Sequence, residues 1–193
     1  PVYDEDRRTG RLFPEGGLLP GARYTVEVSA AVQDLVGNRP NNAITWTFST
    51  QVPQLVQTTP TIGATEVAID DGRLSVVFDA PIWTAVLSFE EAVQVVSEGV
   101  VQALRDAPQF DADSNTLNFE LNAGFRPGSR YEVTLSNLLA GPLRAQEGEG
   151  DFRWEFQTVI PQLVRRSPEG SGVTDEEIEA EFSAALDASL VST

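Results

Sequence analysis

An internal repeat limits the fold of this chain more than any other feature of its sequence. The run at residues 19–28, which contains Pro-Gly-x-Arg-Tyr, returns at residues 126–135. The run Thr-Trp-Thr-Phe-Ser-Thr at residues 45–50 returns as Arg-Trp-Glu-Phe-Gln-Thr at residues 153–158, 108 positions later. A repeat of this length indicates one structural unit that occurs several times along the chain.

The repeat divides the chain into three parts. Pro-Gln-Leu-Val begins at Pro53 and again at Pro161, which sets the period of the complete unit. We expect the C-terminal half of one unit at residues 1–50, a complete unit at residues 51–159 and the N-terminal part of a further unit at residues 160–193. Because the chain begins without Met, we expect a processed chain or, as the favoured interpretation, a window from a longer tandem array.

Short runs rich in β-branched and aromatic residues fill the complete unit, and turn signals containing Gly, Asn or Asp separate them. No long segment has a convincing helical period, although residues 89–96 allow a helical turn at their start. The spacing predicts an all-β fold, with each unit a β-sandwich. The expected strands cover residues 55–58, 74–78, 92–96, 100–104, 116–121, 131–136 and 152–158.

Alternation within these strands predicts the core. Odd positions in residues 117–121 and 131–135, and even positions in residues 152–156, are apolar, and the positions between them are mostly polar. A sheet with one solvated face points such apolar positions inwards. We therefore expect Trp46 and Trp154 to be core rings. The residues expected to carry a structural role are Tyr24, Tyr131, Trp46, Trp154, Phe48, Phe156, Phe78 and Phe119.

The repeated Pro-Gly-x-Arg-Tyr element predicts a more specific feature. A Tyr that opens a late strand directly after a Pro-Gly turn resembles a tyrosine corner, in which the hydroxyl bonds back to nearby backbone and fixes a Greek-key crossing. Tyr24 and Tyr131 both occupy this position. We expect each hydroxyl to bond to the backbone shortly before its own strand.

The order of these motifs resembles a known family. Pro60-x-x-Gly63-Ala64 is followed by Leu-Ser-Val-Val-Phe-Asp-Ala-Pro-Ile at residues 74–82, then Phe-x-Pro-Gly-x-x-Tyr at residues 125–131 and Phe-x-Trp-x-Phe-x-Thr at residues 152–158. This order is similar to that of the bacterial Ig-like domains found in tandem in S-layer and other large surface proteins. The first unit also has the family's Asp-x-x-Gly-Asn loop at residues 34–38, whereas the complete unit lacks it.

The resemblance implies tandem Ig-like β-sandwich (Greek-key) repeats of about 108 residues, located outside the cytoplasm or on the cell surface of a bacterium. It implies a rod-like spacer, or a building block of a fibre or surface layer, usually without catalysis. The expected partners are neighbouring Ig-like repeats of the same chain or copies of itself. Two alternatives stay open: a fibre subunit that polymerises head to tail by strand complementation, and an adhesin or an accessory binding module of a carbohydrate-acting enzyme.

The composition excludes several function classes. The chain has no His, Cys, Met or Lys, since all 13 of its cations are Arg. The usual general base, a thiolate nucleophile, a Lys Schiff base and a Cys- or His-based metal site are therefore ruled out. A net charge of −16 argues against nucleic acid as a partner, and no apolar run is long enough to predict a membrane span. The charge fits either a saline exterior or a high-GC genome.

Acidic pairs raise the question of a metal. Asp4 and Asp6 precede one expected strand, and Asp111 and Asp113 precede the equivalent strand of the next unit. Calcium prefers several oxygen ligands, so these four residues are weak candidates for a calcium site. Asp and Asn are also the residues that a tight hairpin turn needs for backbone reasons. We favour the structural turn and expect no obligatory cofactor and no enzymatic activity.

Overall fold

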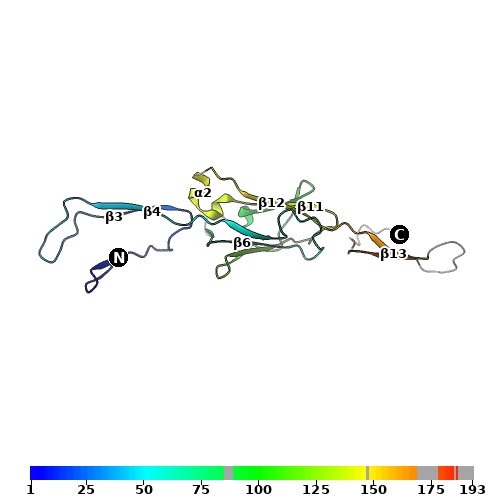
Figure 1. Cartoon of the computed structure of the whole chain (residues 1–193), viewed down its shortest axis with the longest axis horizontal. Coiled ribbons are helices and arrows are strands. Elements are labelled where there is room, and N and C mark those ends of the chain that lie inside the picture. Colours follow the sequence, from blue (N-terminus) through cyan, green and yellow to red (C-terminus); the bar gives the residue numbers. More distant parts are fainter. Residues whose placement is uncertain (85–88, 147, 169–177, 185, 187–193) are drawn as a thin grey trace.

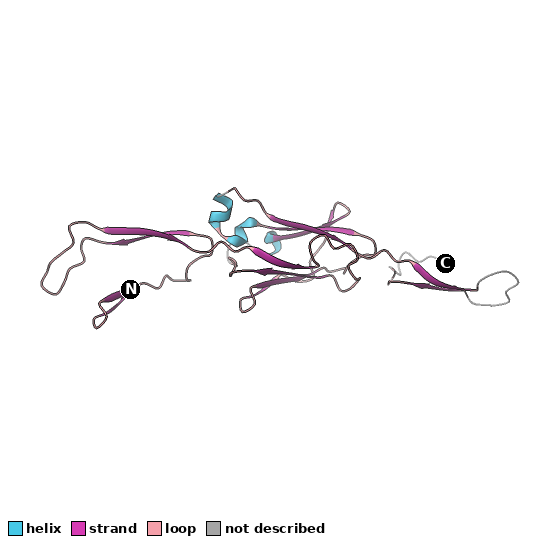
Figure 2. Cartoon of the chain, in the orientation of Figure 1, coloured by secondary structure: helices cyan, strands magenta, loops and turns pink. Residues whose placement is uncertain are grey.

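The computed structural model describes residues 1–84, 89–146, 148–168, 178–184 and 186. The molecule is elongated, with a two-layered β-sandwich in the middle and β-hairpins towards both ends (Figure 1). Strands dominate, and the short helices gather at the end of the sandwich that faces the N-terminal hairpins (Figure 2). The chain is therefore an all-β protein with a β-sandwich at its centre, as the sequence predicts.

One sheet of the sandwich contains four antiparallel strands in the order β5–β6–β10–β9. Its strands are β5 (Leu55–Thr59), β6 (Arg73–Phe78), β9 (Gln109–Asp111) and β10 (Thr116–Glu120). β10 lies between two partners, so that Leu117 is opposite Val76 on one side and Phe110 on the other. The connection from β9 to β10 is a hairpin, whereas β6 and β10 are neighbours only because the chain has crossed to the other sheet and returned.

The second sheet has the order β12–β11–β7–β8. Its strands are β7 (Val93–Ser97), β8 (Val100–Val101), β11 (Arg130–Leu135) and β12 (Phe152–Gln157). The helix α1 (Phe89–Ala92) leads into β7. Between β11 and β12 the chain forms the 3-10 helix η1 (Asn137–Ala140) and the helix α2 (Pro142–Gln146).

The segment between β5 and β6 ties the two sheets together. It leaves the first sheet after β5 and runs parallel to the end of β12, with Val67 opposite Thr158. Four backbone hydrogen bonds hold this pair: Gly63 N–H to Glu155 O (2.7 Å), Gln157 N–H to Ala64 O (2.7 Å), Val67 N–H to Gln157 O (3.1 Å) and Val159 N–H to Val67 O (2.9 Å). The N-terminal part of the unit thereby closes one edge of the second sheet.

The core lies between the two sheets. The alternating apolar positions of β10, β11 and β12 are buried, while Arg153 and Glu155 between them are exposed, which confirms the predicted alternation. The rings of Phe125, Tyr131 and Phe156 pack on one another with centroids 5.2 Å apart. Burial of each large apolar side chain stabilises the fold by roughly 2 kcal/mol, so this layer is the main source of stability.

The N-terminal hairpins repeat the registers of the sandwich. β3 (Arg23–Val28) and β4 (Ile44–Ser49) pair Tyr24 with Phe48, as β11 and β12 pair Tyr131 with Phe156. β1 (Val2–Asp4) and β2 (Thr9–Arg11) form a hairpin with the register of β9 and β10, since a turn of the same length joins them. The repeat in sequence is therefore also a repeat in strand pairing.

The C-terminal hairpin repeats the start of the unit. β13 (Leu163–Ser167) and β14 (Glu179–Phe182) pair Leu163 with Phe182, as β5 and β6 pair Leu55 with Phe78. Both pairings have an irregularity directly after their first residue pair. The four-residue shortening of this part of the repeat falls between the two strands, where the structure leaves residues 169–177 undescribed.

Two sequence-based expectations about the elements differ from the structure. The strand expected at residues 100–104 ends at Val101, because the chain then crosses to the other sheet and Leu104 bridges to Leu121. The helices η1 and α2 were not expected, since each is too short to produce a helical period. The side chain of Ser136 starts η1 by accepting a hydrogen bond from Leu138 N–H (3.3 Å), and Pro142 occupies the first position of α2.

The expectation that Trp46 is a core ring is wrong for the described residues. Trp46 is 49% exposed, whereas Trp154 at the equivalent position is 3% exposed. The difference arises because Trp154 faces the first sheet of the sandwich, while the described residues place no second sheet over the β3–β4 hairpin. Phe48 is partly exposed for the same reason, at 37%.

Candidate functional site at the joint between units

The joint between the units begins with the turn at Pro20 and Gly21, which the side chains of Tyr24 and Thr50 hold in place. Tyr24 Oη accepts a hydrogen bond from Leu19 N–H (2.7 Å). Thr50 Oγ1 donates to Leu19 O (2.6 Å) and accepts from Ala22 N–H (2.9 Å). The turn at Pro20 and Gly21 is thus held between strand β3 and the residue that follows β4, and its outer surface faces the sandwich.

The linker into the sandwich is bonded at nearly every residue. Thr50 N–H donates to Ala22 O (2.9 Å), and Gln51 O accepts from Gly21 N–H (2.7 Å). Pro53 is fully buried. Gln54 and Asp79 then form a reciprocal pair, in which Gln54 N–H donates to Asp79 Oδ1 (2.7 Å) and Asp79 N–H to Gln54 O (3.1 Å). The linker is thus held at Thr50, Gln51 and Gln54, with Pro53 buried between them.

The segment from η1 to α2 lies directly against the turn. Leu143 N–H donates to Gly21 O (2.7 Å). A Cβ atom on Gly21 would lie 2.0 Å from Ala140 O, and a Cβ atom on Gly141 would lie 2.0 Å from Pro20 O. Any side chain at these glycines would push the two backbones apart, so the units meet through main-chain atoms.

The sandwich holds the η1–α2 segment rigidly for this contact. Trp83 N–H donates to Leu139 O (2.7 Å), and Gly141 N–H donates to Leu138 O (2.9 Å). Leu139, Ala140 and Leu143 are buried. Gly141 has φ 89° and ψ 171°, a conformation that only glycine adopts without strain.

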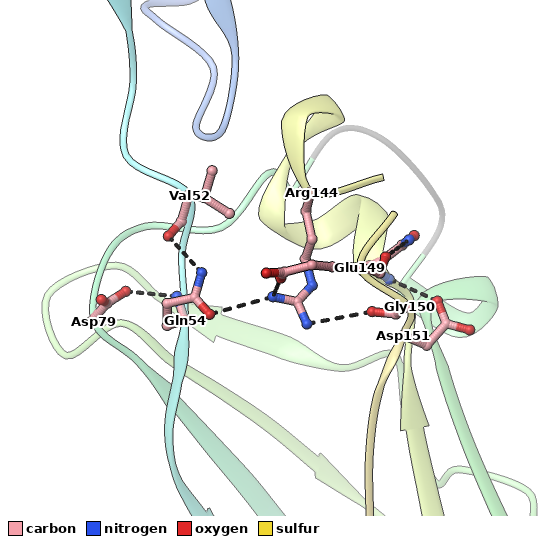
Figure 3. Close-up of polar contacts among 8 residues, drawn as sticks. Val52, Gln54, Asp79, Arg144, Glu149, Gly150 and Asp151 are labelled. Atoms are coloured by element: carbon pink, nitrogen blue, oxygen red, sulfur yellow. Dashed lines mark hydrogen bonds and ion pairs between the residues drawn. The ribbon is translucent and has the colours of Figure 1, made fainter. Parts of the chain in front are cut away.

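Arg144 fastens α2 to the linker residue before β5 and to the loop that leads into β12 (Figure 3). Its guanidinium lies 3.8 Å from the ring centroid of Phe152 and forms an ion pair with Glu149. It also donates to Gln54 Oε1 (3.4 Å) and to Gly150 O (3.4 Å). Its side chain is only 11% exposed, so the guanidinium and its stem act as packing as well as charge.

The complete unit carries the same corner at its far end. Tyr131 Oη accepts from Arg126 N–H (2.8 Å), and Thr158 Oγ1 donates to Arg126 O (2.6 Å). Tyr131 is fully buried, and its ring stacks on Phe156 with centroids 5.2 Å apart. Tyr24 stacks on Phe48 in the same way, at 5.4 Å.

Other residues singled out in the sequence lie in the core of the sandwich, away from the joint surface. Phe78 packs edge-on against Phe152 with centroids 5.7 Å apart, and Phe119 is 5% exposed. Their contribution is burial of apolar surface, which is non-directional. They support the sandwich that carries the joint.

The acidic candidates for calcium lie in two equivalent hairpin turns. Asp4 accepts from Arg7 N–H (3.1 Å), and Asp111 accepts from Asp113 N–H (3.0 Å) and from Ser114 Oγ (2.7 Å). The hydrogen bond from Ser114 and then that from Asp113 lower the pKa of Asp111 below its ordinary value of 3.8. Within the described ranges, no group of three or more carboxylates converges as a metal site, Asp6 included.

The loop at residues 34–38 is built around Asp34. Its carboxylate accepts from the Asn38 side chain (2.7 Å), from Asn38 N–H (2.8 Å) and from Val36 N–H (2.9 Å). The bonds from Asn38 are the main reason that the pKa of Asp34 is lowered. The carboxylate therefore organises its own loop.

Sequence reasoning missed the residues that form the joint. Thr50 and Thr158 repeat with the same offset as the tryptophans, which was a usable signal. Gly21 was noted only as part of a turn. Gly141 could not be found in the same way, because its contact with Pro20 lies far away along the chain.

Comparison with known proteins agrees with the repeat. The sequence model of the bacterial Ig-like domain matches residues 1–50 and again residues 51–158. No curated protein sequence matches the chain. In the part of the chain that the structure describes, no helix is long and apolar enough to cross a membrane.

Several solved structures are similar to parts of the chain. The N-terminal part of the bacterial S-layer protein SbsC has 14% identity over 60% of this chain and 26% of that chain, with a TM-score of 0.38. An LD transpeptidase in complex with imipenem has 18% identity over 56% of this chain and 40% of that chain, with a TM-score of 0.37. CopC from Methylosinus trichosporium OB3b has 12% identity over 56% of this chain and 94% of that chain, also with a TM-score of 0.37. The match spans 26% of the S-layer fragment's own length.

Proposed function

Because the chain belongs to the family of bacterial Ig-like domains, we propose that it is a structural, non-catalytic segment of a large extracellular or cell-surface protein. Its role is to extend that protein as a stiff spacer, or to serve as a repeated building block of a fibre or surface layer. Its partners are the neighbouring Ig-like units. The division into parts at residues 1–50, 51–159 and 160–193 belongs to this proposal.

The contact between Gly21 and the segment that contains Gly141 is the observation that carries the proposal. A spacer needs joints that keep successive units in a fixed direction. Here the backbones touch, Leu143 N–H bonds to Gly21 O, and the linker is hydrogen-bonded up to Gln54. A compact unit of this size has a diameter of roughly 35 Å, and a fixed joint adds that length at every repeat.

The surface chemistry supports a role outside the cytoplasm. The net charge of −16 without any Lys keeps such a surface soluble and repels other acidic polymers. The proposal rests on the structure of the joint and on the surface charge, and it assigns no substrate.

The experiment is immunodetection in the source cells with antibodies raised against residues 51–159. We expect intact cells to be labelled, and we expect the labelled polypeptide in denaturing gels to be far larger than 20.9 kDa. Labelling only after lysis would overturn the surface location. A labelled band near 20.9 kDa would overturn the tandem array in favour of a discrete subunit.

One observation favours the strand-complementation alternative. The hairpin β3–β4 exposes Trp46 and Phe48, and the hairpin β13–β14 exposes Leu163 and Phe182. Apolar hairpin faces of this kind can be buried by complementary strands of another copy. Light scattering of the isolated chain tests this: particle mass that grows with concentration supports polymerisation, and a constant monomer mass contradicts it.

A further inference from the structure

We infer that the turn at Pro127 and Gly128 is a docking surface for the following Ig-like unit, and that its occupant is the segment of that unit equivalent to residues 137–143. The occupant is a short helical turn that ends in a small residue and a glycine, as Ala140 and Gly141 do here. This inference rests on the proposed tandem arrangement and adds the rule by which successive units join.

The two turns are built alike. Tyr24 and Thr50 bond to the two backbone groups of Leu19, and Tyr131 and Thr158 bond to those of Arg126. Gly21 has φ 50° and Gly128 has φ 62°. Gly21 N–H donates to Gln51 O (2.7 Å), and Gly128 N–H donates to Val159 O (2.9 Å). Both turns therefore present the same backbone surface to the unit that follows.

The two turns differ in what covers them. Gly21 and Ala22 are buried, whereas Gly128 and Ser129 are partly exposed. A Cβ atom on Gly21 would meet Ala140 O at 2.0 Å, whereas a Cβ atom on Gly128 would meet only Ile160 Cγ1, at 3.4 Å. Among the described residues, the surface that receives the η1–α2 segment at the first turn is open at the second.

The chain also leaves the two turns in the same way. Gln162 N–H donates to Ser183 Oγ (2.9 Å), and Ser183 N–H donates to Gln162 O (2.8 Å). The first joint has the same reciprocal pair between Gln54 and Asp79. Because the next unit starts with the same strand pairing after the same linker length, its own equivalent of residues 137–143 is carried to Gly128.

This surface recognises its occupant by steric fit and by one backbone hydrogen bond. At the first joint, a carbonyl oxygen occupies the space where a side chain on Gly21 would lie, and Gly21 O accepts one N–H bond from the incoming segment. An occupant therefore needs a backbone carbonyl and a glycine at the contact, followed two residues later by a backbone donor. A unit with a side chain at the glycine position would not seat.

The test is a chain in which residues 53–159 replace residues 161–193, so that a second copy of the complete unit follows Ile160. The junction keeps the natural Pro-Gln-Leu-Val sequence. With segmental isotope labelling, amide hydrogen exchange is measured at Leu143 in each copy. We expect both amides to be protected by at least ~10-fold over their unprotected rates, since both are bonded to a glycine carbonyl.

Two matched variants separate the two joints. Gly128→Ala in the first copy should abolish the protection of Leu143 in the second copy and leave the protection of Leu143 in the first copy unchanged. Gly21→Ala should do the reverse. Both substitutions place alanine at a similar positive φ, so their intrinsic backbone cost is the same. Thermal unfolding of each variant provides the control for folding.

An unprotected second-copy Leu143 in the otherwise unchanged chain would overturn the inference, and so would a Gly128→Ala variant with intact protection. Neither outcome affects surface labelling or polypeptide mass in the source cells. The inference and the proposed function can therefore fail separately.

Discussion

Tyr131 and Thr158 bind the two backbone groups of a single residue, Arg126. Its N–H donates to the Tyr131 hydroxyl (2.8 Å), and its carbonyl accepts from the Thr158 hydroxyl (2.6 Å). Thr158 also accepts from Ser129 N–H (2.9 Å). The tyrosine corner is therefore one half of a clamp, and the threonine after the last strand is the other half.

Tyr131→Phe is expected to lower the free energy of unfolding by about 1 kcal/mol, because Arg126 N–H loses its partner while the ring keeps its packing. Urea denaturation followed by tryptophan fluorescence measures the change. Tyr3→Phe is the matched control, since Tyr3 is 64% exposed and its substitution should change little. A Tyr131→Phe variant as stable as the parent would contradict the role of the hydroxyl.

Thr158→Val is expected to cost more than Tyr131→Phe, about 2 kcal/mol. The reason is that Thr158 is fully buried and its hydroxyl serves the backbone on both sides of the turn. Thr158→Ser retains the hydroxyl and should recover most of the loss. Urea denaturation measures both variants, and a Thr158→Val variant as stable as the parent would mean that the hydroxyl is not what the position requires.

Arg144→Met is expected to change the free energy of unfolding by less than about 1 kcal/mol, whereas Arg144→Ala should cost about 2 kcal/mol. Met keeps the packing on Phe152 and removes a buried charge whose Nε has no hydrogen-bond partner in the described structure. Ala removes the packing as well. Urea denaturation of both variants checks the order, and an equal loss would show that the charge dominates.

Ser114→Ala is expected to raise the pKa of Asp111 towards 3.8, since the hydrogen bond from Ser114 is the main reason that this pKa is lowered. A carboxylate whose pKa is lowered in the folded state stabilises the fold at pH values above its unfolded pKa. This stabilisation is lost as the pH falls through the folded pKa. The contribution therefore exists at neutral pH and disappears in acid below about pH 4. NMR titration of the Asp111 carboxylate measures the shift, with Asp34 as the internal control.

The parts of the fold that follow local rules could be predicted. The alternation at residues 131–135 and 152–156 identifies the core, because side chains in a strand point to opposite faces in turn. The position of Tyr131 after a Pro-Gly turn predicts the corner, because the turn and the tyrosine are close together in the sequence. The exposure of Trp46 could not be predicted from its own strand, since burial depends on whether another sheet covers it.

The joint could not be predicted from the sequence. Gly21 and Gly141 are far apart along the chain, and they meet through backbone atoms, so no side-chain pattern marks the contact. Arg144 likewise depends on Phe152 in β12 and on Gln54 in the linker before β5. The repeated Thr50 and Thr158 and the repeated Pro-Gly turn left a signal in the sequence, but its meaning depends on the segment that packs against the turn.

The parallel pairing of residues 63–67 with the end of β12 determines how the unit carries tension. A force along the molecule pulls residues 63–67 from their N-terminal end and β12 from its C-terminal end. Since the two run in the same direction, the load slides them past each other, and the four backbone hydrogen bonds from Gly63 to Val159 resist together. Extraction of one strand under force requires them to break at once, which makes forced unfolding slow.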